Sequence, residues 1–260
     1  IMWQRSDKLA FRPEDVDPVS VCSGRVLLVD CHDTMASTRA ARCARAAGIP
    51  TVIDVEYVRP GIEHLLREID IIITSEDFPE QLTGISQPGQ ALRSIQKEYK
   101  STLVCMTLGS RGSLTLLGNE EIATPGFPVK VIDSTGAGDV FRGGFISAWL
   151  RADDSTTVAD IFRYANATAA MKCRKLGART GIPSQKELEM FLRFDREEFL
   201  ASVSAYEEAC QIDPDPDRVE TRRRRRIAVE ALVKHTIDEI WSGHLDRAKD
   251  LGEDLVGLIH

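Results

Sequence analysis

Hydrophobic and polar positions follow a regular order along the first part of the chain, where short apolar runs are separated by longer segments that favour helix. The apolar runs have the length and composition of buried parallel strands and occupy 25–30, 50–55, 70–74 and 102–108. The helix-favouring segments occupy 35–47, 61–68 and part of 86–99. Strands that alternate with helices predict an α/β fold, with a mainly parallel, doubly wound sheet that helices cover on both faces.

The carboxyl ends of such strands are where a parallel sheet binds its ligands. Asp54 and Ser75 fall at strand ends of this kind, as does the run 30–33, Asp-Cys-His-Asp. The run has two interpretations. It could form a metal or proton-transfer cluster, or it could be a strand end and turn whose Asp33 or Thr34 caps the next helix. Capping is the commoner use of these residue types and is the interpretation that the sequence favours.

The segment 131–145, VIDSTGAGDVFRGGF, carries the clearest chemical signal in the chain. A short β-type run ends at Asp133, a glycine-rich turn follows at 134–138, and Asp139 stands at the start of an apolar helix. Small residues let the backbone approach an anion closely, and a helix N-terminus offers free N–H groups. A carboxylate beside a bound phosphate can act as a base, which indicates phosphoryl transfer to a hydroxyl.

Two other glycine-rich motifs do not match this segment. A dinucleotide fingerprint needs a third glycine, and Phe141 occupies that position. A phosphate-binding P-loop ends in Gly-Lys-Ser or Gly-Lys-Thr, which the chain lacks. The remaining alternative to a phosphate site is a plain strand-to-helix turn with an aspartate that caps the helix.

The words D-S-T-G-A-G-D at 133–139, followed by V-F-R-G-G-F, resemble the signature of the ribokinase-like (PfkB) carbohydrate kinases, from which only Ser134 departs. The resemblance implies a ribokinase-like fold and identifies Asp139 as the catalytic base. It also implies an anion hole made by the amides of Gly136, Ala137 and Gly138.

Two further segments resemble parts of the same family. The run 103–117 reads as two β-type runs hinged at 109–112, similar to the family's G-x-x-G turn beside the nucleotide phosphates; an ordinary hairpin turn is the alternative. The segment 165–183 is similar to the last core helix and the loop that flanks adenine and, in several members, a monovalent cation. For Asn166 the alternative is an exposed helix residue. The nucleotide-binding candidates that the resemblance implies are Thr107, Gly109, Ser110, Gly112, Asn166 and Gly177.

The magnesium motif of the family is altered in this chain. Many members carry N-x-x-E where this chain has Ser75 and Phe78, and Phe78 has no oxygen to offer. Glu76 and Asp77, which are adjacent, could substitute for the missing carboxylate. The metal candidates are therefore Glu76 and Asp133, and the cofactors that the resemblance implies are ATP, Mg²⁺ and, as in several members, a monovalent cation.

The resemblance covers about 16–192 and predicts a kinase domain at 1–194, without the family's small β lid and first strands. The region 195–260 predicts a helical extension with helices at 196–210, 218–241 and 244–259. This extension could cover an exposed edge of the core or form the contact of a homodimer.

Composition agrees with a cytoplasmic enzyme that binds small molecules. The chain has 260 residues, 43% of them hydrophobic, and a net charge of −7, which argues against nucleic acid as a partner. The arginine run 222–226 reads as a solvated helix face. No apolar run approaches the roughly 18 residues of a membrane helix. Six scattered cysteines without a C-x-x-C pair indicate reduced thiols.

These observations predict an ATP-dependent carbohydrate kinase that transfers the γ-phosphoryl group to a sugar hydroxyl. A nucleoside or phosphosugar kinase of the same family is the first alternative. The second is a catalytically weak nucleotide-binding remnant that acts as an interaction protein. The intact Asp139 favours an enzyme, whereas the change at Ser75 and Phe78 favours the remnant.

Overall fold

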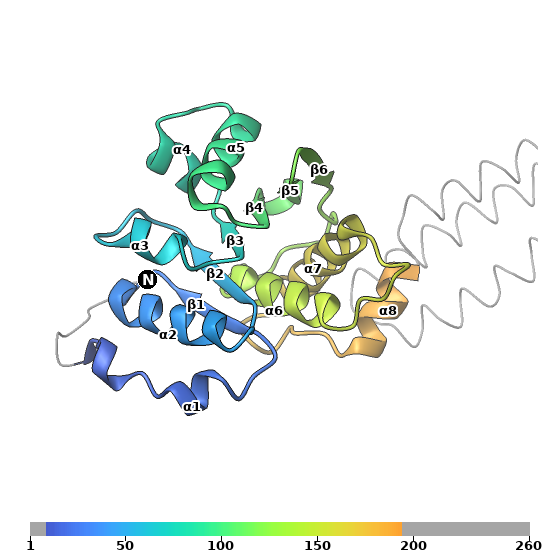
Figure 1. Ribbon diagram of the computed structural model, residues 1–260. Coiled ribbons are helices and arrows are strands. Elements are labelled where there is room, and N and C mark those ends of the chain that lie inside the picture. Colours follow the sequence, from blue (N-terminus) through green and yellow to red (C-terminus); the bar gives the residue numbers. More distant parts are fainter. Residues whose placement is uncertain (1–8, 194–260) are drawn as a thin grey trace, which may run out of the picture. The chain divides into compact units, whose positions relative to one another are not determined.

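The computed structural model describes residues 9–193 of the chain (Figure 1). Its described residues divide into two compact units. We call the unit made of 9–127 and 142–166 the sheet unit, and the unit made of 128–141 and 167–193 the turn unit. Among the described residues, none of the helices has the length and the apolar character needed to cross a membrane.

The helices and strands alternate along the chain as the sequence predicts (Figure 1). In chain order they are η2 (Pro13–Asp15), α1 (Pro18–Val21), β1 (Leu27–Asp30), α2 (Thr34–Ala46), β2 (Thr51–Val55), α3 (Ile62–Leu66), β3 (Ile71–Thr74), α4 (Phe78–Thr83), α5 (Pro88–Tyr99), β4 (Leu103–Thr107), η3 (Gly109–Arg111), β5 (Ser113–Leu117), β6 (Glu120–Thr124), α6 (Ala137–Trp149), α7 (Val158–Lys172) and α8 (Gln185–Arg193).

The sheet unit contains a six-stranded sheet with the order β1-β2-β3-β4-β5-β6. The first four strands are parallel, and β5 and β6 continue the sheet in antiparallel pairs. In the register of the parallel pairs Asp30 lies opposite Asp54, and Asp54 lies opposite Ile73. The mainly parallel sheet is thus confirmed, and the carboxyl ends of its parallel strands lie level with one another.

Helices cover both faces of this sheet. On one face Ile53, Ile72 and Val104 are fully buried in a core that includes side chains of α2, α3 and α5. Successive side chains of a strand point to opposite faces. Asp54, next to Ile53, therefore points to the other face, where it forms an ion pair with Arg142 of α6. This arrangement confirms the prediction of helices on both faces.

The helix α5 shows how the sequence sets the bounds of an element. Its first residue is proline, which suits the first helical position because that N–H has no partner in the helix. The side chain of Gln87 accepts a hydrogen bond from the Gln90 N–H at 3.0 Å. Leu92 and Ile95 lie three residues apart on the buried face. The helix ends at Tyr99, and Lys100 follows it in the left-handed conformation, with φ +58°.

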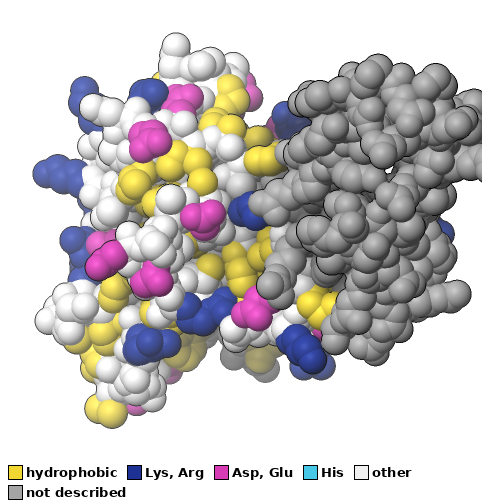
Figure 2. All heavy atoms as spheres, turned by 90° about the vertical axis from the view of Figure 1, so that its right-hand side faces the viewer, with side chains coloured by type: hydrophobic (Ala, Val, Ile, Leu, Met, Phe, Trp, Pro, Cys, Tyr) yellow, Lys and Arg dark blue, Asp and Glu magenta, His cyan; other side chains and the backbone are white. Residues whose placement is uncertain are grey.

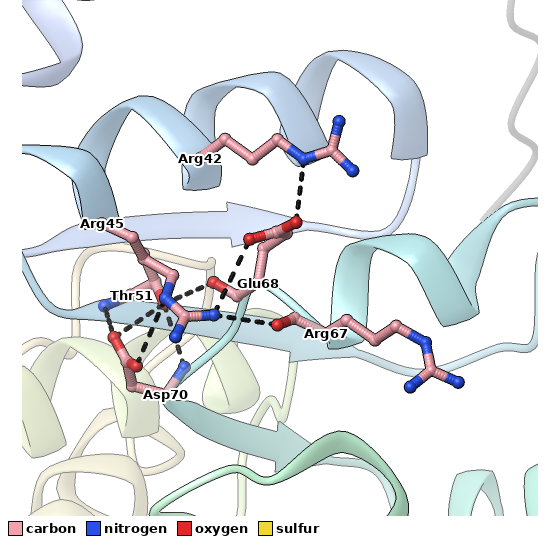
Figure 3. A network of polar contacts seen from close by, with 6 residues as sticks. All are labelled: Arg42, Arg45, Thr51, Arg67, Glu68 and Asp70. Atoms are coloured by element: carbon pink, nitrogen blue, oxygen red, sulfur yellow. Dashed lines mark hydrogen bonds and ion pairs between the residues drawn. The ribbon is translucent and has the colours of Figure 1, made fainter.

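A polar network joins helix and strands at the amino end of the sheet (Figure 3). The Asp70 carboxylate accepts hydrogen bonds from the N–H of Thr51 at 2.9 Å and from its hydroxyl at 3.0 Å. Glu68 pairs with Arg42 at 2.8 Å and with Arg45 at 3.7 Å, both from α2. These groups hold α2 against the starts of β2 and β3. The network is structural, and it lies at the opposite end of the strands from Asp54.

Two local predictions are wrong. The run 131–133 is not a strand, because the N–H groups of Ile132 and Asp133 both donate to the carbonyl of Cys173, at 2.8 and 3.1 Å. Asp33 occupies the position before α2, but its side chain makes no capping hydrogen bond. Instead the Asp33 carboxylate accepts a hydrogen bond from the Phe11 N–H at 3.2 Å.

The cysteines of the described residues are all free thiols, as predicted. Burial raises the pKa of the Cys105 thiol to about 12. Cys210 and the predicted helical extension 195–260, with its arginine run, lie outside the described residues. The domain division at 194 and 195 therefore stays a prediction.

Candidate active site

The start of α6 in the turn unit presents unused backbone donors. The Ser134 carbonyl accepts from the Ala137 N–H, and the Gly136 carbonyl accepts from the Val140 N–H, both at 3.0 Å. Between them, the N–H groups of Gly138 and Asp139 donate to no other group of the described part of the chain. Two unpaired N–H groups at the positive end of a helix form a site for an anion.

Of the predicted anion-hole amides, that of Ala137 is thus already paired within the turn. Gly136 has φ +76°, a conformation that side-chain-bearing residues rarely adopt. A Cβ on Gly136 would also lie 3.1 Å from the Cβ of Ala178. Glycine therefore allows both the bend of the turn and its close approach to the loop around Ala178. The anion-binding role of Gly136 and Gly138 stays a prediction.

Asp139, the predicted base, is exposed in the first turn of α6. Its carboxylate accepts no hydrogen bond from another residue in the described ranges. The side chain is therefore available to a ligand at the same helix end that carries the unused N–H groups. This is the arrangement that a base needs if it is to accept a proton beside a bound phosphate.

Asp133 holds the turn and the loop after α7 together. Its Oδ1 accepts a hydrogen bond from the Thr135 N–H at 2.9 Å, and its Oδ2 accepts one from the Gly177 N–H at 2.7 Å. The Thr135 N–H is the largest cause that lowers the pKa of Asp133 to about 2. Both oxygens are therefore used within the protein, and the metal role predicted for Asp133 stays a prediction. Gly177, with φ +91°, contributes its N–H to this contact.

Lys172, the last residue of α7, is a member of this site that sequence reasoning missed. Its side chain is completely buried, and its Nζ donates a hydrogen bond to the Asp133 carbonyl at 2.7 Å. The available signal was one lysine inside the apolar run AAMKC at 169–173. Buried lysines are rare unless they are paired.

The sheet unit contains the predicted G-x-x-G turn as a hairpin between β4 and β5. Gly112 has φ +95°, and a Cβ there would lie 2.5 Å from the nitrogen of Gly126. Gly109 has φ +59° and open space where a Cβ would be, and Ser110 is exposed. The hydroxyl of Thr107 donates to the Thr74 carbonyl at 3.1 Å. The hairpin is confirmed, and the nucleotide role of these residues stays a prediction.

Asn166 is buried, so the alternative of an exposed helix residue is wrong. Its Nδ2 donates to the Ser113 hydroxyl at 3.2 Å, and to the carbonyls of Thr124 and Pro125 at 3.3 and 3.4 Å. The side chain thus holds α7 against β5 and the end of β6. This contact gives Asn166 a structural role, and its predicted nucleotide role is untested.

The altered magnesium motif has a clear structural consequence. Phe78 is completely buried in the core, where the family motif has a glutamate. Glu76 is exposed and forms an ion pair with Arg111 of the hairpin turn. The Ser75 hydroxyl donates to the Glu56 carbonyl at 3.2 Å. Within 9–193, no three His, Cys, Asp or Glu side chains cluster as metal ligands would. The metal role predicted for Glu76 stays a prediction.

The ion pair of Asp54 with Arg142 was also missed from the sequence. The Arg142 side chain is 3% exposed and that of Asp54 is 19% exposed. An arginine buried to this degree needs a counter-charge, and Asp54 supplies it. Asp54, predicted only as a polar strand end, therefore fixes α6 on the sheet.

The predicted site residues thus fall into two groups. Those of the turn unit are in contact with one another or share one turn: Asp133, Gly136, Ala137, Gly138, Asp139 and Gly177. Those of the sheet unit are Glu76, Thr107, Gly109, Ser110, Gly112 and Asn166.

Comparisons with known proteins agree on one family of kinases. The model of a family described as pfkB family carbohydrate kinase matches residues 3–185. A ribokinase of Haemophilus influenzae is 32% identical over 157 residues, which are 59% of this chain and 50% of that protein. The chain spans about half the length of the curated relatives it matches.

Two solved structures are similar over most of the chain. The Arabidopsis thaliana ribokinase complexed with ribose and ATP has a TM-score of 0.59 and 26% identity, covering 66% of this chain and 57% of that one. The aminoimidazole riboside kinase of Salmonella enterica, complexed with aminoimidazole riboside and an ATP analogue, has a TM-score of 0.58 and 27% identity, covering 70% and 66%.

Proposed function

We propose that this chain, which belongs to the pfkB family of carbohydrate kinases, takes part in ATP-dependent transfer of a γ-phosphoryl group to a sugar hydroxyl. The observation that carries the proposal is the start of α6. An exposed carboxylate, Asp139, stands there at a helix N-terminus, beside two N–H groups that have no acceptor within residues 9–193. Phosphoryl transfer needs both a group that accepts the hydroxyl proton and donors that stabilise charge on the phosphoryl group.

In this proposal Asp139 accepts the proton of the sugar hydroxyl as the hydroxyl oxygen attacks the phosphorus. The N–H groups of Gly138 and Asp139 and the dipole of α6 stabilise negative charge on the transferred group. Asp133 keeps the turn in shape through its contacts with Thr135 and Gly177. These roles use only groups that the turn unit itself contains.

ATP fits these donors, because phosphate is the anion that a glycine-rich turn and a helix N-terminus commonly bind. Magnesium would neutralise charge on the ATP phosphates. Mg²⁺ commonly keeps several waters and takes only one or two protein carboxylates. In the turn unit Asp133 is already paired with backbone N–H groups, which suits an ion that takes most of its ligands from water and phosphate.

The substrate proposal comes from the relatives. The Arabidopsis thaliana ribokinase was solved with ribose and ATP, which supports a small sugar. The riboside kinase of Salmonella enterica, at similar identity, favours a nucleoside-like substrate as the second candidate. Acidic and basic side chains are mixed on the described part of the face in Figure 2, which supports a small molecule over nucleic acid. We place the enzyme in the cytoplasm because its described cysteines are free thiols.

The test is the substitution Asp139→Asn, with Asp154→Asn as the control because Asp154 is also exposed and is outside the turn. ADP release would be measured with pentoses, hexoses and nucleosides, and ATP affinity by calorimetry. We expect Asp139→Asn to leave the ATP Kd nearly unchanged and to lower kcat by about 10²–10⁴, the usual contribution of a general base. Near-normal turnover by this variant would remove Asp139 from the role of base.

A further inference from the structure

Lys172 is a charged side chain that water does not reach, since its exposed fraction is 0%. A buried ammonium is costly unless it is paired and hydrogen-bonded. Its Nζ donates to the Asp133 carbonyl at 2.7 Å, and the carboxylate of the same residue supplies negative charge nearby. The buried charge is therefore placed at the turn that leads to the proposed base.

The groups around this ammonium are rich in oxygen and negative in character. The helix α7 ends at Lys172, so its last carbonyls carry the partial negative charge of a helix C-terminus. The Cys173 carbonyl accepts from the N–H groups of Ile132 and Asp133. The loop returns to the same place at Gly181, where a Cβ would lie 3.0 Å from the Lys172 Cα and closer still to its carbonyl oxygen. The carbonyl oxygens at the end of α7 therefore favour a positive charge next to them.

A monovalent cation, which the resemblance implies beside this loop, does not fit these residues. Both carboxylate oxygens of Asp133 already accept from N–H groups, and its carbonyl accepts from Lys172. A fixed ammonium would also repel a second cation at short range, and the repulsion is strong where water is excluded. The positive charge that this place needs is already part of the chain.

We propose that the ammonium of Lys172 takes over the role of a monovalent cation in this chain, by joining the turn 133–139 to the loop 173–181. Lys172 is then a positioning residue, which acts on the turn through Asp133 and touches no substrate. Nucleotide binding and stability of the turn unit should be independent of potassium. The part that concerns nucleotide rests on the proposed function, whereas the part that concerns stability does not.

The experiment compares wild type, Lys172→Ala and Lys172→Met in potassium chloride and in tetramethylammonium chloride at equal ionic strength. The alanine variant removes the charge and leaves space for an ion, whereas the methionine variant removes the charge and fills the space. Lys186→Ala is the control, because Lys186 is an exposed lysine of α8 in the same unit. The readouts are Tm without nucleotide and the ATP Kd by calorimetry.

We expect wild type and Lys186→Ala to have the same Tm and ATP Kd in both salts. Lys172→Ala should bind ATP about tenfold more weakly in tetramethylammonium, as for loss of one charged hydrogen bond, and potassium should restore both its Kd and its Tm. Lys172→Met should stay impaired in both salts. If potassium restores the Kd and Tm of Lys172→Ala, the side chain acts through its charge and not only through packing.

Three results would overturn the proposal. The first is a wild-type protein whose Tm rises or whose ATP Kd falls in potassium. The second is a Lys172→Met variant with the Tm and ATP Kd of wild type. The third is a Lys172→Ala variant whose Tm and ATP Kd potassium does not restore. If the alanine variant does not fold, the wild type still tests the proposal, because its Tm and ATP Kd should not depend on potassium. If no protein binds ATP, the proposed function fails, and the Tm response alone tests Lys172.

Discussion

Replacing Gly112 by alanine should destabilise the sheet unit much more than the same change at Gly109, which lies in the same hairpin turn. Gly112 has φ +95° and ψ −126°, and a residue held in such a sparsely populated region costs of order 1–3 kcal/mol. A Cβ there would lie 2.5 Å from the Gly126 nitrogen and closer still to the Thr124 carbonyl oxygen. Relief of such an overlap costs typically about 1–3 kcal/mol more.

The two costs add to about 2–6 kcal/mol for Gly112→Ala. Gly109 has φ +59° and no heavy atom within 4 Å of a Cβ. Gly109→Ala should therefore lower the free energy of unfolding only by the cost of the left-handed backbone conformation, about 1–2 kcal/mol. For a domain of this size each kcal/mol lowers Tm by about 2–4 °C. We therefore expect Tm to fall by about 4–24 °C for Gly112→Ala and by about 2–8 °C for Gly109→Ala.

Urea denaturation followed by circular dichroism measures the stability of both variants, and calorimetry measures their ATP Kd. If the turn lies against the nucleotide phosphates, Gly109→Ala should weaken ATP binding even though the fold is retained, because the methyl group enters open space on the turn. Equal losses of stability in the two variants would refute the argument from close backbone approach at Gly112.

Two other predictions concern charged side chains. The hydrogen bonds that lower the pKa of Asp133 to about 2 contribute stability that is present above the unfolded pKa, about 4, and is lost as pH falls through the folded value. Denaturation curves between pH 5 and pH 2 should therefore show a steeper loss for wild type than for Asp133→Asn; parallel losses would contradict the assignment. Arg142→Met removes the arginine of the ion pair with the partly buried Asp54 carboxylate and should cost about 3–5 kcal/mol, part of which the double change with Asp54→Leu should recover in a mutant cycle.

The parallel strands β2, β3 and β4 could be predicted from the sequence because they are almost completely buried and read as continuous apolar runs. The strand β6 could not be predicted in this way. Its first four residues are exposed or half-buried and its sequence, EEIAT, contains two charged side chains, as is common at the edge of a sheet. The six-residue helix α4 is too short to show a helical period, and its Phe78 and Pro79 are buried against other elements.

The run 131–133 has a β-type composition, yet its N–H groups bind the end of α7, about 40 residues further along the chain. Contacts between residues far apart in the sequence also limit what could be predicted of the candidate site. The place of Asp139 at the start of α6 follows from a local motif and could be predicted, whereas Lys172 and Asn166 take their places from partners 39 and 53 residues away. Local composition contains no record of such partners, so only the folded chain reveals them.

The contacts of Asp133 also determine when the candidate site can form during folding. Its hydrogen bonds with Lys172 and Gly177 join residues 39 and 44 positions apart. Closing loops of this length costs chain entropy before any contact compensates for it, so such pairs form after local structure. The helices α6 and α7 lie within this loop, and we expect their local hydrogen bonds to form before the loop closes. The turn next to Asp139 therefore takes its final shape late in folding, and a phosphate that binds there would favour closure of the entire α6–α7 segment.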